Sequence, residues 1–175
     1  GTFHLCHRSY ILPQATQQPL TKLLMGHLPA PKDHRHLDLV SPLQEAEQAF
    51  QEGEIPVGAV VVSQNRIIAR AHNLTETLTD VTAHAEMQAI TAAANLLGGK
   101  YLNECTLYVT IEPCVMCAGA LNWSQIGKIV YGASDEKRGY RKFAPAALHP
   151  KTELVFGVLE NECAQLMREF FQKKR

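Results

Sequence analysis

Two short runs of residues constrain the fold of this chain more than any other feature, because they form one set of zinc ligands only if distant segments converge. The first run is Thr-Ala-His-Ala-Glu at 82–86, and the second is Glu-Pro-Cys-Val-Met-Cys at 112–117. Imidazole and thiolate are common zinc ligands, so His84, Cys114 and Cys117 form a candidate set of three. The fourth position of a tetrahedral ion is then left to water, which indicates a catalytic metal site.

The spacing of these residues predicts that each run opens a helix. Cys114 and Cys117 are three residues apart, so on a helix both sulfurs lie on one face, where the free amides of the first turn favour the thiolate form. Pro113 suits a helix start, because the first amide hydrogens of a helix have no partner within it and proline lacks this hydrogen. His84 and Glu86 are two residues apart and diverge on a regular helix. Both face a pocket only if their helix begins at its rim.

The pattern of apolar and turn residues predicts alternating helices and strands. A capping Ser41 followed by Pro42 predicts that the first helix runs from Ser41 to about Glu52. We expect strands at 57–62, 66–71, 106–110, 128–132 and 154–159, and further helices at 83–97, 114–121 and 161–172. This alternation predicts a layered α/β domain.

The domain organisation follows from a change of character near residue 40. Residues 1–40 contain scattered histidines and prolines without a helical or strand period, so we expect a poorly ordered or non-native extension rather than a second metal site. The chain has 175 residues and 46% apolar content. That is enough for one domain with a real core, which we place at 41–175.

Composition limits the compartment and the partners. Five cysteines with one close pair make a poor disulfide framework, and no run approaches the length of a membrane span or resembles a secretion signal. We therefore expect a cytoplasmic protein without a membrane partner. Seventeen basic and seventeen acidic side chains give no net charge, so a nucleic acid would have to be held by local basic patches.

The carboxylate of Glu86 is not needed as a ligand and completes the expected chemistry. A zinc ion held by the three ligands would supply hydroxide for attack on an electron-poor ring carbon that carries an amino group, and Glu86 would move protons from the water to the ring nitrogen and the leaving amine. The expected products are a ring carbonyl and ammonia, so we expect a hydrolase that acts on an amidine-type C–N bond. The two runs together resemble the signature of the zinc nucleobase deaminases, and the expected reaction is what this resemblance implies.

Four segments resemble the bacterial tRNA adenosine deaminases, and the resemblance extends from about residue 43 to the end of the chain. It implies a cytidine deaminase-like fold of three α/β/α layers with a central five-stranded mixed sheet. It also implies one Zn²⁺ per subunit, a homodimer and a tRNA anticodon stem-loop as partner, in which the wobble adenosine becomes inosine. The segments that carry it are 54–62, 82–86, 106–110 and 112–120.

The same resemblance assigns residues around the base. Asn73 matches the base-contacting asparagine of the family, and Asp135 matches an aspartate that meets the ribose. Val57 and the backbone of Glu112 and Pro113 match the lining of the base pocket. An asparagine that forms a turn, a solvated loop carboxylate and ordinary core packing are the alternatives.

Two basic and aromatic segments are expected to hold RNA by phosphate contacts and stacking. One is the loop around 137–143, and the other is the end of the last helix. Solvated charges and aromatic rings that cover the core are the alternatives. The residues that we expect to contact RNA are Lys137, Arg138, Phe170, Phe171, Lys173 and Lys174.

Other functions fit parts of the pattern. A guanine or cytosine deaminase of the same fold would use the same ligands on a free base. A Cys-x-x-Cys redox pair would leave His84 and Glu86 unexplained, and a structural-zinc protein would need a fourth ligand, for which Cys105 is the nearest candidate. Two positions depart from the family. Val81 stands where proline is usual, and Pro42 is expected to start the first helix later than in the family.

Overall fold

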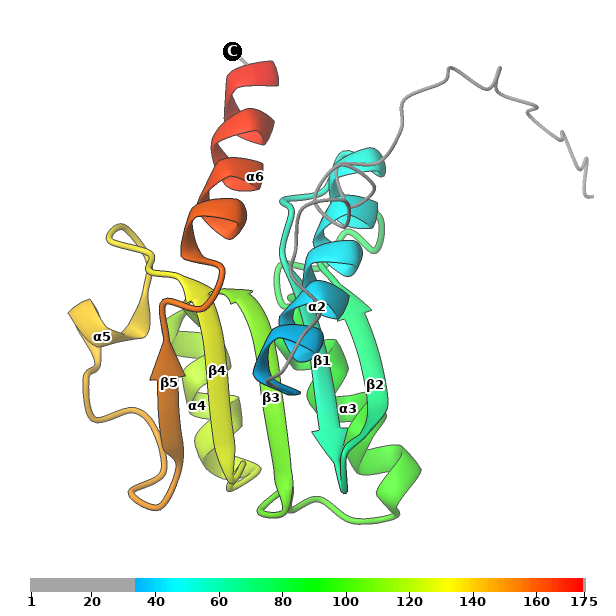
Figure 1. Cartoon of the computed structure of the whole chain (residues 1–175), viewed down its shortest axis with the longest axis vertical. Coiled ribbons are helices and arrows are strands. Elements are labelled where there is room, and N and C mark those ends of the chain that lie inside the picture. The colour runs from blue at the N-terminus through cyan, green and yellow to red at the C-terminus, as the bar shows by residue number, and fades with distance from the viewer. Residues whose placement is uncertain (1–33, 175) are drawn as a thin grey trace, which may run out of the picture.

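The computed structural model describes residues 34–174, with side chains from residue 39 onward. Most of the segment at 1–40 therefore lies outside the described residues. In chain order the elements are α2 (His34–Gln51), β1 (Gly58–Ser63), β2 (Arg66–His72), α3 (Ala85–Leu97), β3 (Cys105–Ile111), α4 (Val115–Trp123), β4 (Lys128–Ala133), α5 (Tyr140–Phe143), β5 (Glu153–Phe156) and α6 (Glu160–Lys173) (Figure 1). Within this part of the chain, no helix has the length and apolar character needed to cross a bilayer.

The five strands form one mixed sheet, as predicted. Their order is β2-β1-β3-β4-β5. β1 runs antiparallel to both β2 and β3, whereas β4 is parallel to both β3 and β5. Parallel neighbours need a crossover, and α4 makes it between β3 and β4. The carboxyl ends of β3 and β4 therefore lie at the same end of the sheet.

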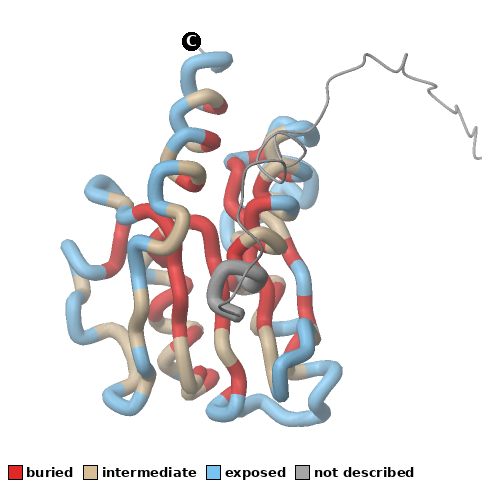
Figure 2. The backbone as a smooth tube through the Cα atoms, viewed as in Figure 1, coloured by how far each residue is buried: buried red, intermediate tan, exposed pale blue. Residues whose placement is uncertain are grey.

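Helices cover both faces of the sheet and give the three expected layers (Figure 1). Alternate strand residues point to opposite faces. Val61 and Leu107 are buried with the helices α3 and α4, while Val60 and Tyr108 are buried with Leu39 of α2. The central strands are buried over most of their length (Figure 2). The two apolar clusters thus place α3 and α4 on one face and α2 on the other, and a third cluster joins Leu43 of α2 to Cys163 of α6.

The predicted start of the first helix is wrong. Helix α2 begins at His34 and continues through Pro42. An internal proline removes one helical hydrogen bond and strains the preceding turn, at a cost of about 3 kcal/mol. Leu39 and Pro42 are both fully buried, and their packing against the sheet compensates for that loss. The prediction that Pro42 shortens this helix relative to the family is wrong for the same reason.

The remaining predicted elements agree with the structure to within two residues, with two exceptions. The last strand ends at Phe156 instead of 159, because Gly157 and Leu159 have positive φ and turn the chain into α6. Val158 and Leu159 still pack against the core on the α2 face. The segment 133–152 contains the short helix α5, which the sequence pattern did not indicate.

We expect Gly58→Ala to destabilise the fold, because helix α2 passes directly over Gly58. A Cβ atom at this position would overlap the carbonyl oxygen of Pro42 and lie 2.5 Å from the amide nitrogen of Ala46. Overpacking of this kind lowers the free energy of unfolding by about 1–3 kcal/mol. Gly119→Ala on α4 is the control, since a Cβ there meets nothing within 4 Å and should stabilise the helix by roughly 0.5–1 kcal/mol. Urea unfolding of both variants checks this, and an unchanged Gly58→Ala midpoint would contradict the packing.

Candidate active site

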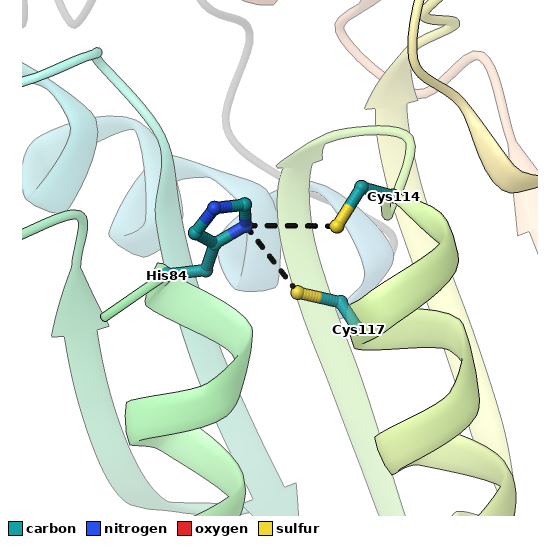
Figure 3. A group of neighbouring side chains, drawn as sticks. All are labelled: His84, Cys114 and Cys117. Atoms are coloured by element: carbon teal, nitrogen blue, oxygen red, sulfur yellow. Dashed lines mark hydrogen bonds between the residues drawn. The ribbon is translucent and has the colours of Figure 1, made fainter. Parts of the chain in front are cut away.

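The three predicted ligands meet where two helices begin. His84 is the N-cap of α3 and Cys114 the N-cap of α4, while Cys117 lies in the first turn of α4. His84 Nδ1 is 3.6 Å from Cys114 Sγ and 3.5 Å from Cys117 Sγ. Figure 3 shows the three side chains pointing toward one another from the two helices. The three ligands converge because α3 and α4 cover the same face of the sheet and begin at the same end of its strands.

The donor atoms have the spacing that zinc requires. In a tetrahedral site with Zn–N of about 2.0–2.1 Å and Zn–S of about 2.3 Å, a nitrogen and a sulfur ligand lie about 3.6 Å apart. The three donors of the group lie within 4.8 Å of one another. In the described part of the chain, no fourth histidine, cysteine or carboxylate joins them. The group therefore fits a zinc ion with three protein ligands.

Hydrogen bonds within the group favour a thiolate. The contacts of Cys114 with Cys117 and His84 lower the pKa of the Cys114 thiol to about 4, against the opposing effect of burial. The pKa of His84 is raised, first by its hydrogen bond to Cys114. The pKa of Cys117 is raised because it hydrogen-bonds Cys114 and is buried. Cys114 is thus held in the anionic form that binds zinc.

Glu86 lies beside the ligand group without joining it. It occupies the first turn of α3 and is 3% exposed. Burial raises the pKa of its carboxyl to about 7, and the nearby Cys114 thiolate acts in the same direction. His84 precedes the helix in an extended conformation, with φ −71° and ψ 153°. This break in the helical geometry explains how side chains two residues apart both face the pocket.

A cleft of about 1020 Å³ opens over this group and is lined by both His84 and Glu86. Its volume is at the upper end of the range for small-molecule sites, which suits a nucleotide with part of its backbone. Most of the predicted substrate residues lie on its wall. Those that do are Val57, Asn73, Glu112, Asp135, Lys137, Arg138, Phe171 and Lys174.

Three predicted substrate residues lie outside the cleft. Phe170 is 4% exposed and packs edge-to-face on Phe50, with ring centroids 5.6 Å apart. The expectation that its ring contacts RNA is therefore corrected, because the ring anchors α6 against α2. Lys173 is exposed, but its Nζ lies over the Phe50 ring. Pro113 is buried, and its carbonyl oxygen accepts the N–H of Tyr140.

The side chain of Glu112 has a structural role that sequence analysis missed. Its two carboxylate oxygens accept the backbone N–H groups of Asp135 at 3.1 Å and Arg141 at 3.0 Å. Gly139 lies so close that a Cβ would overlap this carboxylate. The Oδ1 of Asp135 in turn accepts the backbone N–H groups of the residues two and three positions further along the loop. Glu112 therefore shapes the loop that carries Asp135 to the cleft.

Sequence analysis also missed several residues of the cleft wall. Helix α6 contributes residues beyond those predicted, and Arg168 lies three positions before Phe171, so both occupy one helix face. That helical spacing is the signal that predicts Arg168 once Phe171 is placed. The additional lining residues are Ile55, Thr75, Ile111, Met167, Arg168 and Gln172. A buried glutamate behind the wall, Glu54, was also missed, because no spacing rule links it to the metal group.

The three-layer fold with its His-Cys-Cys group and adjacent buried glutamate defines a deaminase of the cytidine deaminase-like class. Residues 37–175 match the MafB19-like deaminase family. The chain is 45% identical over 138 residues to the tRNA-specific adenosine deaminase of Aquifex aeolicus, which covers 76% of this chain and 91% of that protein. The chain therefore belongs to the MafB19-like deaminase family and to the family of tRNA-specific adenosine deaminases.

Two solved deaminase structures align with this chain. A structure from studies of A-to-I editing by tRNA:A34 deaminases aligns with a TM-score of 0.69 and 39% identity, over 77% of this chain and 99% of that chain. The guanine deaminase of Bacillus subtilis aligns with a TM-score of 0.55 and 38% identity, over 58% of this chain and 65% of that one. The tRNA deaminase thus matches a larger part of this chain at similar identity.

Proposed function

We propose that this protein hydrolyses adenosine to inosine at the wobble position of a tRNA anticodon. The observation that carries the proposal is a buried Glu86 beside a three-ligand group, at the base of a cleft bordered by basic side chains. Similarity to the Aquifex aeolicus enzyme over most of both chains supports the substrate. A cleft bordered by such side chains also suits a polymer better than a free base.

His84, Cys114 and Cys117 would hold one zinc ion per subunit. Zinc, when bound, supplies a Lewis acid that lowers the pKa of a coordinated water to about 7. Glu86 accepts a proton from the attacking water and delivers it to N1 of adenine. The C6–N6 bond then breaks, and Glu86 passes the remaining hydroxyl proton to the departing amine, so that inosine and ammonia form. Glu86 is available for both transfers because it is not a ligand.

The RNA would be held by two segments of the cleft wall. Lys137 and Arg138 lie on the loop that Glu112 shapes, while Arg168, Phe171 and Lys174 lie on α6. Basic side chains contact phosphates without reading sequence, and an exposed aromatic ring stacks on an extruded base. We assign the anticodon loop to these segments, with Val57 and Asn73 beside the target nucleotide and Asp135 near its ribose.

We also propose that the protein acts in the cytoplasm as a homodimer. Large apolar side chains on and near α4 support a protein interface: Trp123 is 86% exposed, Val115 43% and Phe143 58%. Light scattering at micromolar concentration tests this, with a mass of twice the chain expected. A monomer by this measurement would exclude a stable dimer.

Incubation with a tRNA anticodon stem-loop carrying a wobble adenosine tests the proposed reaction. Digestion to nucleosides followed by chromatography should show inosine, while guanine incubated separately should yield little xanthine. A stem-loop with guanosine at the same position is the control and should remain unchanged. Xanthine from guanine without any inosine would replace the proposal with the guanine deaminase alternative.

The structural-zinc and redox alternatives find less support. Cys105 stands at the start of β3, the end of the strand opposite to the ligand group, so it is badly placed as a fourth ligand. A redox pair would need only the two thiols, whereas His84 Nδ1 lies at ligand spacing from both. Only a metal site accounts for all three donor atoms.

A further inference from the structure

A buried glutamate behind the cleft wall, Glu54, has no role in the chemistry described above. Helix α2 ends at Gln51, and Gly53 follows with φ of +80° in the turn that buries the side chain of Glu54 fully. Its carboxylate accepts the backbone N–H of Thr77 at 2.7 Å and of Glu76 at 3.2 Å. Burial opposes ionisation, but the backbone and side-chain hydrogen bonds from residues 75–77 together outweigh it and lower the pKa of Glu54. The group is therefore an anion that can only accept hydrogen bonds.

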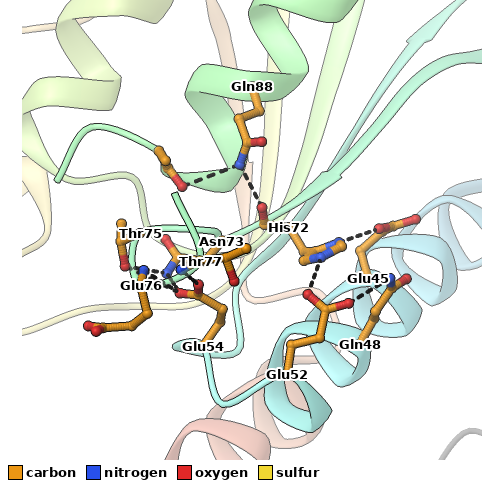
Figure 4. A network of polar contacts seen from close by, with 11 residues as sticks. Glu45, Gln48, Glu52, Glu54, His72, Asn73, Thr75, Glu76, Thr77 and Gln88 are labelled. Atoms are coloured by element: carbon orange, nitrogen blue, oxygen red, sulfur yellow. Dashed lines mark hydrogen bonds and ion pairs between the residues drawn. The ribbon is translucent and has the colours of Figure 1, made fainter. Parts of the chain in front are cut away.

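The same carboxylate binds the side chain of Asn73 (Figure 4). Asn73 Nδ2 donates to Glu54 Oε2 at 3.0 Å and to Thr75 Oγ1 at 3.0 Å. An amide nitrogen has two hydrogens, so both are committed. Every fully buried polar side-chain atom of the described residues has a hydrogen-bond partner, whereas Asn73 Oδ1 has none among these residues. Asn73 Oδ1 is therefore not fully buried, and it is accessible from the cleft that Asn73 lines. A carboxylate at Glu54 thus determines which way the Asn73 amide faces.

We propose that Glu54 is a positioning residue for substrate binding, which fixes the Asn73 amide so that its carbonyl oxygen alone faces the nucleotide. This inference rests on the proposed function. An acceptor at this place selects a donor on the substrate, whereas N1, N3 and N7 of adenine are all acceptors. The partner that fits is a hydroxyl donor on the ribose, because the exocyclic amine is the leaving group. Thr75 supports the arrangement, since its hydroxyl also lies 3.3 Å from Glu54 Oε2.

Steady-state kinetics of a double-mutant cycle test this coupling. Glu54→Gln keeps the shape of the side chain but lets the Asn73 amide turn, and we expect kcat/KM to fall about tenfold, mainly through a higher KM. In an Asn73→Ala background the same change should alter kcat/KM less than about twofold. Glu52→Gln, on an exposed neighbouring side chain that binds His72 instead, is the matched control and should resemble wild type.

A reciprocal exchange separates positioning from mere stability. In the double variant Glu54→Gln with Asn73→Asp, the glutamine amide can donate to the new carboxylate, which still presents an acceptor to the cleft. We expect it to recover kcat/KM relative to either single variant. Equal losses from Glu54→Gln with and without Asn73 would overturn the proposal, and so would failure of the exchange to recover activity when thermal melting shows a folded protein. A wild-type protein that forms no inosine would instead refute the proposed function, and the cycle would then be measured with guanine.

Discussion

Glu86→Gln is expected to abolish turnover while leaving the metal in place. The substitution preserves volume and hydrogen-bonding capacity but removes the group that carries protons. General acid–base catalysis contributes about 10²–10⁴-fold, and Glu86 acts in two transfers, so kcat should fall by at least about 10³-fold. Single-turnover formation of inosine measures the loss, and atomic absorption of the same sample measures zinc.

Glu104→Gln is the matched control for this prediction. Glu104 is exposed and directly precedes β3, at the end of the strand opposite to the site. Glu104→Gln changes the net charge by the same amount as Glu86→Gln and should retain full activity. If Glu86→Gln kept more than a tenth of the wild-type rate, Glu86 could not be the proton carrier. If zinc were lost with it, the carboxylate would be a ligand, contrary to its place outside the donor group.

Cys117→Ser is expected to remove both zinc and activity. Cys117 is fully buried, and its Sγ lies 3.5 Å from His84 Nδ1, which is the spacing of two ligand atoms around one zinc ion. Loss of a group that merely orients a ligand already costs 10–100-fold in metal affinity, so loss of a ligand should cost at least about 100-fold. Zinc binds only the folded state strongly, and adding it should therefore raise the Tm of the wild type but not of this variant.

Cys105→Ser is the comparison that makes this result specific. Cys105 is also buried, at 2% exposure, but it lies at the far end of β3. The variant should bind one equivalent of zinc and keep its response to added metal, even if burial of a hydroxyl lowers its stability. Zinc loss in Cys105→Ser at the level seen for Cys117→Ser would support a closed structural site with four protein ligands.

Local sequence patterns predicted most elements of the fold because their causes are local. Strand alternation and the Gly98 that ends α3 in the left-handed region mark boundaries in the sequence itself. The start of α2 depends instead on tertiary packing. Pro42 is a strong local signal for a helix start, but burial of Leu39 against the sheet compensates for an internal proline. The sequence around Pro42 does not reveal that the sheet will pack against Leu39.

The metal group was predictable because its spacing carries chemical information. A histidine and a Cys-x-x-Cys pair together restrict the possible sites, and Pro113 marked the start of the helix that carries the two cysteines. The cleft wall was harder, since Phe170 and Phe171 are identical in sequence terms while only one faces the cleft. Their difference arises from the register of α6 against Phe50. Glu54 could not be predicted because its partners, two backbone amides and the side chains of Asn73 and Thr75, come from a segment about 20 residues further along the chain.

X-ray absorption at the zinc edge of the purified protein tests the central claim most directly. The account predicts one zinc per chain with two sulfur ligands at about 2.3 Å and two lighter ligands at about 2.0–2.1 Å. One lighter ligand is the His84 imidazole, and the other should exchange when a small anion is added. A spectrum with three sulfurs, or with no exchangeable position, would contradict a catalytic site built from His84, Cys114 and Cys117.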